Sequence, residues 1–399
     1  MKIAIYHNLR SGGAKRALFN YTKGLVENGH TVDVFAAPTA DEDFLDVRPL
    51  VRSYHEVPLW VSPGSTFGRT RVGAALALYA TSLALARHGR AAAKAIDAGD
   101  YDVAFVAQCQ FANSPDVLRY LATPSAYYCQ EPRRVSFEYS VRYHTAQVSR
   151  QIRFVHALYL ALLDPWLRRR DIRAARSATL ILANSYYSVE SIKRAYGRYA
   201  RVAYLGTDLG ALRAADVPRG NAIISVGALE PAKCHELVVD AVGTVPESRR
   251  PQMHVVADRS FSGRARALAD RAAALGVVLS IHERISDGEL VELYSSARAA
   301  VCAAELEPFG FTPLEAMACA TPVVAVREGG YKETVIDGVN GRLVERDPDE
   351  LGLAIDALLA DEASWRELSD GALDSVGRWS VQAATATLER LLAELVAAS

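Results

Sequence analysis

The sequence is poor in cysteine, methionine and tryptophan, and it lacks any long apolar run. Its 399 residues include five cysteines, three methionines and four tryptophans. The cysteines (Cys109, Cys129, Cys234, Cys302 and Cys319) are odd in number and scattered. This spacing fits neither a disulfide framework nor a cysteine metal site, and it suits a reducing compartment. No apolar stretch approaches the roughly 18 residues of a membrane span.

An excess of one charge sign is also missing. The formal net charge is −1, half of the residues are apolar and 23% are charged, which is typical of a soluble globular protein. Near neutrality argues against a protein whose whole surface binds nucleic acid, although a local basic patch stays possible. The start, Met1 to Tyr6, reads as a short strand that runs into polar residues. We therefore expect no signal peptide and a cytoplasmic protein.

The chain alternates between strand and helix patterns twice over, with a break near residue 208. A strand at 2–6, a turn with Gly12-Gly13, a helix at 14–28 closed by Gly29 as C-cap and a strand at 31–36 open the first half. An Ala/Leu-rich helical layer is expected at 60–96 and an amphipathic terminal helix at 381–398. The remaining strands are expected at 101–108, from 127, and at 178–184, 201–204, 222–227, 253–257, 277–281, 299–303, 322–326 and 341–344. This alternation predicts an α/β protein of two doubly wound domains, with ligands beyond the carboxyl ends of the strands.

The stretch from Ala304 to Met317 carries the strongest local signal. A loop follows the strand at 299–303, and Thr312 is a plausible N-cap with Pro313 at the first helical position. Backbone N–H groups at such a helix start suit a phosphate or sugar hydroxyls, and Glu307 and Glu315 bracket them. Thr312-x-x-Glu315 equally fits a capping box, in which Glu315 has only a structural role.

The order Glu-Pro-Phe-Gly-Phe-Thr-Pro-Leu-Glu-Ala-Met at 307–317 resembles the E-x7-E segment of the retaining family 4 glycosyltransferases of the GT-B type. The pairing of Ala183-Asn184-Ser185 with Tyr204-x-Gly206-x-Asp208 also looks like this family. The resemblance implies two Rossmann-like domains facing across a cleft, an acceptor-side domain at 1–207 and a donor domain at 208–380. It further implies a terminal helix at 381–399 that packs back on the first domain.

The resemblance also implies an activity and a set of site residues. It implies sugar transfer from a nucleotide-diphosphate sugar to a hydroxyl acceptor with retention, without a cofactor or metal. The catalytic residues would be Glu307, Lys233 and Gln130. The donor would be bound by Gly12, Gly13, Lys233, Arg284, Glu307, Phe309, Gly310, Phe311, Thr312 and Glu315. Lys233 would grip the diphosphate, Glu307 would lie by the sugar ring, and Glu315 would bind the ribose hydroxyls.

Three positions depart from the family pattern. Ala228 stands where an arginine usually grips the diphosphate, and Cys234 stands where a glycine usually follows the lysine. Gln130, in Gln130-Glu131-Pro132, stands where many relatives have a histidine that contacts the transferred sugar. Glutamine cannot act as an acid, a base or a cation, but it can hydrogen-bond a sugar hydroxyl.

The acceptor side has several interpretations. The candidate acceptor-side residues are Glu131, Arg133 and Arg134. The two arginines could meet an anionic acceptor, or they could be exposed loop charges. The segment 133–176 is rich in arginine with interleaved aromatics. It suits either a helix on a membrane surface, serving a lipid-linked acceptor at the inner membrane face, or a helix packed on its own domain.

Other functions remain as alternatives. Ala228 and Gln130 also suit a non-catalytic nucleotide-sugar-binding or partner subunit, and a GT-B nucleotide-sugar epimerase is a third hypothesis. Asp41-Glu42-Asp43 reads as a polar turn rather than a metal site. An NAD enzyme is poorly supported, because neither half opens with G-x-G-x-x-G.

Overall fold

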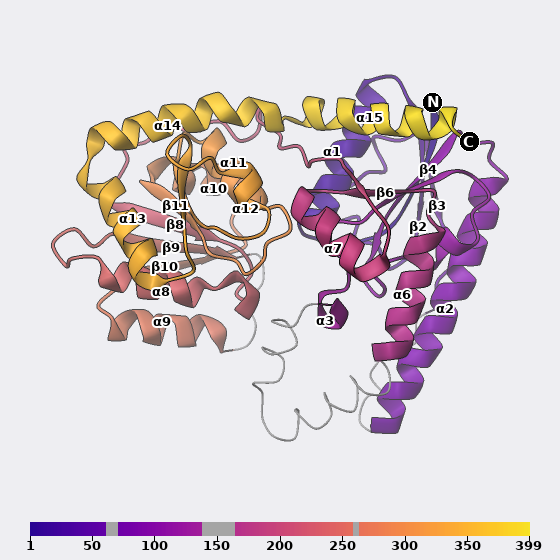
Figure 1. Cartoon of the computed structure of the whole chain (residues 1–399), viewed down its shortest axis with the longest axis horizontal. Helices are drawn as coiled ribbons and strands as arrows, with labels where there is room; N and C mark the ends of the chain where they lie inside the picture. The colour runs from indigo at the N-terminus through magenta and orange to yellow at the C-terminus, as the bar shows by residue number, and fades with distance from the viewer. Residues whose placement is uncertain (61–70, 138–163, 258–262) are drawn as a thin grey trace. The chain divides into compact units, whose positions relative to one another are not determined.

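The computed structural model describes residues 1–60, 71–137, 164–257 and 263–399, which form two compact units. The first unit comprises Met1–Gly206 together with Val381–Ser399, and the second comprises Thr207–Ser380. Each unit is built on its own parallel sheet with helices on both faces, as Figure 1 shows. The architecture is therefore α/β, as the alternation of strand and helix patterns predicts.

The first unit contains a seven-stranded sheet in the order β3-β2-β1-β4-β5-β6-β7. All neighbouring strands are parallel. Their bounds are β1 Lys2–Asn8, β2 Thr31–Ala36, β3 Ser53–Glu56, β4 Val103–Cys109, β5 Ser125–Tyr128, β6 Leu180–Ala183 and β7 Arg201–Val202. The central strands are almost wholly buried, which is why β1 and β4 read as continuous apolar runs rather than alternating ones.

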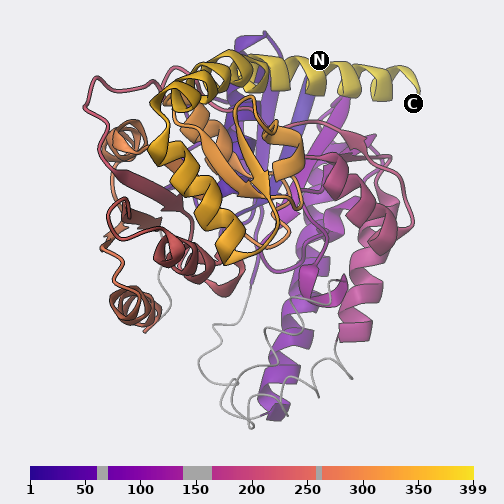
Figure 2. The same ribbon diagram turned by 60° about the vertical axis from the view of Figure 1, so that its left-hand side comes forward.

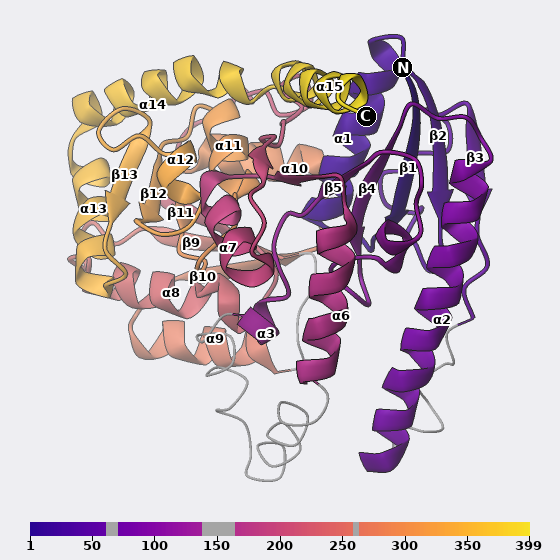
Figure 3. The ribbon, with the colours of Figure 1, turned by 45° about the vertical axis from the view of Figure 1, so that its right-hand side comes forward.

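The helices of the first unit cover both faces of this sheet. They are α1 Gly13–Glu27, α2 Arg71–Asp97, η1 Asp116–Arg119, α3 Arg134–Phe137, α6 Asp164–Ser177, α7 Tyr186–Tyr196 and α15 Val381–Ala397. The C-terminal helix α15 packs against α1 (Figures 1 and 3), and its Glu389 accepts a 2.9 Å hydrogen bond from Asn28 just beyond α1. In Figure 2, α2 and α6 run alongside each other, and the rings of Tyr79 and Trp166 join them with centroids 6.1 Å apart.

The second unit contains a six-stranded parallel sheet in the order β10-β9-β8-β11-β12-β13. The bounds are β8 Ala222–Val226, β9 Gln252–Ala257, β10 Leu279–Glu283, β11 Ala299–Cys302, β12 Val323–Val326 and β13 Gly341–Val344. In order of appearance along the chain this is the 3-2-1-4-5-6 arrangement of Rossmann-like folds.

Two helical layers enclose the second sheet. Helix α8 (His235–Thr244) packs against α9 (Arg264–Ala274) and α13 (Pro348–Ala360), whereas α11 (Phe311–Ala318) packs against α10 (Asp287–Ser296) and α14 (Glu362–Val376). Figures 1 and 3 show α8 with α9 and α10 with α11 as separate groups. Three shorter elements complete the unit: η2 Pro231–Lys233, α12 Tyr331–Thr334 and η3 Gly377–Trp379.

Most predicted elements are confirmed, with shifts at their ends. The strands expected at 31–36 and 341–344 have these bounds, and α2 confirms the helical layer from Arg71, while residues 61–70 lie outside the described part. The edge strand β3 was not predicted, because Ser-Tyr-His-Glu is short and polar and pairs only with β2. Gly29 is not the C-cap of α1 as predicted; Asn28 is, and Gly29 follows it at a φ of 82°.

The strand order places two switch points, one in each unit. In the first unit β1 and β4 are neighbours from which the chain winds in opposite directions, and in the second unit β8 and β11 have the same relationship. Crevices at the carboxyl ends of such strand pairs are where doubly wound folds bind ligands. The loops after β1, β8 and β11 carry Gly12-Gly13, Lys233 and Glu307 respectively.

Candidate functional site

The loop after β8 packs closely against the side chain of Lys233. Gly227 has a φ of 156°, and a Cβ at this position would lie 3.2 Å from both Cγ and Cδ of Lys233. The buried ring of His235 holds the loop from below, because its Nδ1 lies 3.0 Å from Ser225 Oγ and its Nε2 3.1 Å from the Gly227 carbonyl. Lys233 is the only cation between Gly227 and Cys234, so Ala228 leaves this loop with a single positive side chain.

Lys233 and Glu307 meet at the switch point of the second sheet. The Nζ atom of Lys233 donates to Glu307 Oε2 across 2.6 Å, and the two side chains are 28% and 20% exposed. The structure therefore brings together the two charged residues that the sequence assigned to catalysis. A partly exposed pair of this kind leaves both charges accessible to a ligand.

Cys234 follows Lys233 in a left-handed conformation with a φ of 52°. It is the C-cap of η2 and the N-cap of α8. Glycine adopts such a φ without steric penalty, which accounts for the glycine that the resembled family has at this position. Burial raises the pKa of the Cys234 thiol, so the thiol is neutral at physiological pH.

The loop that carries Glu307 packs closely on the turn after β12. The amide of Gly330 donates to the Glu307 carbonyl across 2.8 Å, and a Cβ on Gly330 would lie 2.5 Å from Phe309 Cα. The Phe309 ring is buried against Phe311 and Trp379, with centroids 5.8 and 5.5 Å away. Any contact of Phe309 with a ligand would therefore come from its backbone.

Helix α11 begins two residues earlier than expected. Its first residue is Phe311 and its N-cap is Gly310, so Thr312 lies inside the helix and the predicted N-cap role of Thr312 is wrong. Glu315 does not complete a capping box; it is buried and its Oε2 accepts a 3.1 Å hydrogen bond from the Tyr294 hydroxyl of α10. The Glu315 carboxylate therefore hydrogen-bonds a side chain of another helix, whereas the local pattern predicted a bond to the N-cap amide.

Arg284 follows the last residue of β10 and is exposed. Its φ is 54°, and its amide donates to the Ala257 carbonyl across 3.1 Å, which fixes the turn between neighbouring strand ends. The described contacts leave its assignment to a nucleobase as a prediction.

In the first unit, Gln130 reaches the loop that contains Gly12 and Gly13. Its Nε2 lies 3.5 Å from the carbonyl of Ala14 in the first turn of α1, and its own carbonyl accepts a 2.9 Å bond from Ser188 Oγ. Gly12 is the N-cap of α1 with a φ of 133°. Sequence segments more than a hundred residues apart therefore meet at the N-terminus of α1.

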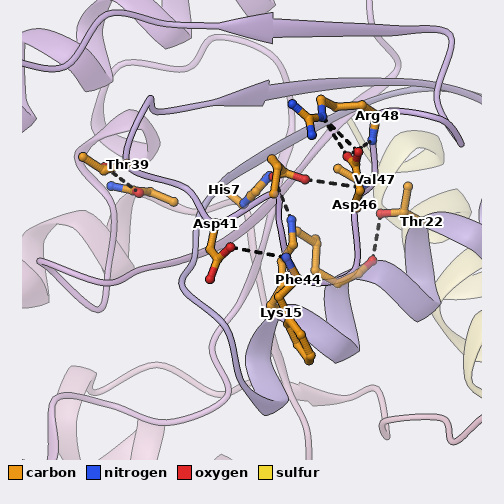
Figure 4. Close-up of polar contacts among 12 residues, drawn as sticks. His7, Lys15, Thr22, Thr39, Asp41, Phe44, Asp46, Val47 and Arg48 are labelled. Carbon is orange, nitrogen blue, oxygen red and sulfur yellow. Dashed lines mark hydrogen bonds and ion pairs between the residues drawn. The ribbon is translucent and has the colours of Figure 1, made fainter. Parts of the chain in front are cut away.

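A buried charged cluster below this loop was missed by the sequence analysis. Lys15 is fully buried and its Nζ donates to Glu42 Oε1 across 2.7 Å; His7 Nε2 lies 3.1 Å from the same oxygen without the alignment of a hydrogen bond. Figure 4 shows His7 and Lys15 pointing toward each other beside the turn at Asp41. Asp41 Oδ2 accepts from the Ser11 amide across 3.2 Å, so this turn supports the glycine loop.

The cluster has perturbed protonation equilibria. Burial opposes ionisation of Glu42, but contacts with His7 and Lys15 outweigh it and lower its pKa to about 2. Burial lowers the pKa of His7 and that of Lys15 in spite of the nearby carboxylate. The Asp43 and Phe44 amides donate to Asp41 Oδ1, so a turn is present at this segment, but no signal in the local sequence reveals that Glu42 faces inward.

The acceptor-side residues have structural partners. Arg133 Nη1 donates to Ser136 Oγ at 2.8 Å and to Asp164 Oδ1 at 3.0 Å, and Arg134 Nε lies 3.9 Å from Glu131 Oε2. Most of the predicted membrane-facing segment, 138–163, lies outside the described residues. The exposed-charge interpretation is wrong for both arginines, because the side chains of Arg133 and Arg134 are only 20% and 18% exposed.

The described residues contain neither a membrane-spanning helix nor a cluster of metal ligands. None of the described helices is both long and apolar enough to cross a membrane. Within 1–60, 71–137, 164–257 and 263–399, no three His, Cys, Asp or Glu residues gather in a way that could hold a metal ion.

Family models match both units. The model described as glycosyl transferases group 1 matches residues 215–373, and the model described as glycosyltransferase family 4 matches residues 11–210, half of the chain. The chain belongs to the family 4 glycosyltransferases. The resemblance drawn from the segment at 307–317 is confirmed.

Individual relatives share part of their length with this family member. A D-inositol 3-phosphate glycosyltransferase of Geodermatophilus obscurus is 38% identical over 188 residues, which cover 44% of this chain and 40% of the relative. An alpha-maltose-1-phosphate synthase of Mycobacterium tuberculosis is 45% identical over 94 residues, 22% of this chain and 24% of the relative. The matches thus span less than half the length of these curated relatives.

Solved structures share the fold over the whole chain. Sucrose-phosphate synthase from Thermosynechococcus elongatus has a TM-score of 0.76 at 22% identity and covers all of both chains. Anabaena Alr3699/HepE, solved in complex with UDP and glucose, has a TM-score of 0.71 at 19% identity, with 99% of this chain and 100% of that chain covered. At such identities the likeness establishes the GT-B fold of this family member.

Proposed function

We propose that this glycosyltransferase is a retaining enzyme that moves a sugar from a nucleotide-diphosphate sugar to a hydroxyl acceptor without a metal ion. The observation that carries the proposal is the pairing of Lys233 with Glu307 beside the N-terminus of α11. A diphosphate leaving group needs a cation and oriented N–H groups, and a positively charged sugar ring needs a carboxylate. Lys233, the first turn of α11 and Glu307 supply these three elements.

The chemistry then follows from the charges. As the bond between the anomeric carbon and the diphosphate oxygen breaks, negative charge grows on the diphosphate, and Lys233 stabilises it. The acceptor hydroxyl attacks the anomeric carbon from the same face, and its proton passes to a leaving phosphate oxygen. No side chain is needed as a base, so Gln130 would serve as a hydrogen-bonding group for a sugar hydroxyl.

The donor and acceptor classes are chosen from the relatives. Anabaena Alr3699/HepE was solved with UDP and with UDP-glucose, which makes uridine-diphosphate sugars the first donors to test. The relative named D-inositol 3-phosphate glycosyltransferase makes phosphorylated polyols the first acceptors. Glu315 and Arg284 remain our candidates for the ribose and the base, and Glu131 and Arg134 for the acceptor side.

A lipid-linked acceptor is favoured by the surface of α6. Its exposed charged side chains are all arginines, at positions 168, 169, 173 and 176, whereas Asp164 and Asp171 are buried. The exposed aromatic pair Tyr79 and Trp166 lies at the same helix pair. Basic and aromatic side chains together suit peripheral contact with the anionic inner face of a membrane.

The function is tested by donor turnover. The protein is incubated with a panel of nucleotide sugars, with and without phosphorylated or lipid-linked polyols, and released nucleotide and the anomeric configuration of the product are measured. Retained configuration and activity that survives a chelator are expected. Nucleotide binding without release, for any donor, would instead indicate a non-catalytic subunit, as Ala228 suggests, and a changed donor sugar without acceptor would indicate an epimerase.

Membrane contact is tested separately by sedimentation with vesicles. We expect binding to vesicles that contain phosphatidylglycerol and none to pure phosphatidylcholine. Replacing Arg168 and Arg169 by glutamine should reduce the bound fraction, because these side chains are exposed. Equal binding to both vesicle types would contradict the electrostatic part of this proposal.

A further inference from the structure

The segment 303–307, which carries Glu307, is gripped by a distant arginine. Arg346 follows β13, and its Nη1 donates to the Ala303 carbonyl across 2.9 Å while its Nη2 donates to the Ala304 carbonyl across 3.0 Å. The same guanidinium forms a bidentate pair with Glu328 at the end of β12, with Nε–Oε1 at 2.8 Å and Nη2–Oε2 at 2.7 Å. One planar side chain therefore joins three strand ends of the second sheet.

The rest of the segment is held by backbone contacts. The Glu305 amide donates to the carbonyl of Ala232, the residue before Lys233, across 2.8 Å. The Leu306 amide lies 3.4 Å from Glu328 Oε2, and the Glu307 carbonyl accepts from Gly330. Each of the five residues thus has a backbone group in a hydrogen bond that fixes its position.

These hydrogen bonds hold Leu306 in an unfavourable backbone conformation. Its φ is 48°, in the left-handed region that disfavours any residue with a Cβ atom. Strained residues of this kind persist only where surrounding structure over-determines them. If the grip were lost, Leu306 would favour a negative φ, and the following carboxylate of Glu307 would swing away from Lys233.

We propose that Arg346 and Glu328 are positioning residues for catalysis: they hold Leu306 left-handed so that Glu307 stays at Lys233. This inference rests on the proposed function, because it assumes that Glu307 acts on the donor. The side chains of Arg346 and Glu328 hydrogen-bond each other and the backbone of 303–306. They act through the backbone of 303–306 and so should affect turnover more than donor affinity.

The test compares Arg346→Met, Arg346→Lys and Glu328→Gln with the matched control Arg327→Met. Arg327 lies one residue before Glu328, and its Nη2 donates to the Leu343 carbonyl across 2.6 Å. Within the described part of the chain, its side chain contacts Leu343, Asp337 and Glu345 rather than 303–307. We expect kcat to fall about tenfold in Arg346→Met, with the donor KM within twofold of wild type. Arg346→Lys should lose nearly as much, because an ammonium cannot make the planar fork, and Arg327→Met should keep wild-type kcat.

The decisive variant is Leu306→Gly. Glycine adopts the left-handed conformation without penalty. Position 306 would therefore keep its positive φ with less help from the hydrogen bonds of Arg346. Leu306→Gly alone should retain most activity, and in the Arg346→Met background it should recover kcat at least threefold. A merely structural role of Arg346 would not be rescued by a second change that removes a side chain from the loop.

A second readout separates this proposal from the proposed function. Hydrogen exchange of the Glu305 and Leu306 amides, followed by mass spectrometry, should accelerate about tenfold in Arg346→Met and stay unchanged in Arg327→Met. Accelerated exchange in a protein without turnover on any donor would refute the function and leave the grip established. Unchanged exchange, a kcat within twofold of wild type in Arg346→Met, or no rescue by Leu306→Gly would each overturn the proposal.

Discussion

Lys233 Nζ and Glu307 Oε2 lie 2.6 Å apart, so the two side chains form an ion pair in the free protein. In the proposed reaction they act on opposite sides of the bond between the anomeric carbon and the diphosphate, Lys233 on the phosphate and Glu307 on the sugar. A donor diphosphate would have to compete with Glu307 for the ammonium group. In the absence of a ligand, the ion pair holds both side chains in position at the strand ends. When the donor binds, Lys233 would pair with the diphosphate and Glu307 would face the sugar ring.

This competition gives the two variants different signatures. Lys233→Ala should lower kcat/KM by roughly 10²-fold and weaken binding of the nucleotide diphosphate, since a transition-state cation is lost. Glu307→Ala should lower turnover by a similar factor but bind the nucleotide diphosphate at least as tightly as wild type, because Lys233 loses its competing carboxylate. Steady-state kinetics and calorimetry measure the two effects, and the exposed Arg266→Ala serves as a control. Wild-type turnover in both variants would sink the site assignment.

The close approach between Gly330 and the Phe309 backbone makes a second prediction. In Gly330→Ala the new Cβ would lie 2.5 Å from Phe309 Cα and 2.6 Å from the Pro308 carbonyl oxygen, so the segment after Glu307 must move. We expect a loss of activity of at least tenfold, because a shift of about 1 Å at a catalytic group commonly has such an effect. Gly377→Ala, where a Cβ meets nothing within 4 Å, should keep full activity. Equal activities of the two variants in a donor turnover assay would contradict the packing argument.

The sequence predicted what depends on neighbouring residues. The segment 307–315 and Lys233 were predicted as site residues from the family resemblance, whose motif residues lie within a few positions of one another, and the strand pattern placed both after strands. Thr312 was misassigned as an N-cap because α11 begins before it, at Phe311, and Glu315 hydrogen-bonds Tyr294, 21 residues away on another helix. The local sequence pattern does not show whether a side chain hydrogen-bonds a nearby residue or one that is distant in the sequence.

Residues whose roles depend on distant partners were not found. Glu42 lies 27 residues from Lys15, and Arg346 lies 43 residues from Ala303, so their juxtaposition comes only from the order of the strands. A charged residue in a turn is ordinarily solvated, and the sequence alone offers no reason to expect Glu42 to be buried. Such pairs become visible only when the sheet topology is known.

Cys234 provides a test of backbone strain beside the catalytic lysine. Its φ of 52° suits glycine, so Cys234→Gly should raise the free energy of unfolding by up to about 1 kcal/mol, the relief of left-handed strain minus the added freedom of the unfolded chain. Cys234→Ala removes the thiol but keeps the strain and should bring no gain. Chemical denaturation of both variants measures the difference. An equal gain in Cys234→Ala would assign the effect to the thiol instead.

The cluster of His7, Lys15 and Glu42 predicts how stability depends on pH. Both His7 and Glu42 have pKa values lowered by folding, from 6.5 for His7 and from 4.5 to about 2 for Glu42. Therefore, as the pH falls below the ordinary pKa of each group, the unfolded chain binds more protons than the native protein. The contribution of His7 to stability should be lost as the pH falls below about 6.5, and that of Glu42 as the pH falls from about 4.5 towards 2.

Two variants separate these contributions. His7→Asn should flatten the decline just below pH 6.5 and leave the decline below pH 4.5. Glu42→Gln should flatten the lower decline and, at pH 7, destabilise the first unit by about 3–5 kcal/mol, because it leaves the buried Lys15 ammonium unpaired. Replacing both partners, with Lys15→Met and Glu42→Gln together, should restore much of that loss, since the uncompensated charge is gone. Thermal and urea unfolding between pH 3 and pH 8 measure all three proteins against wild type, and a stability profile of His7→Asn that parallels the wild type would show that this ring does not titrate with folding.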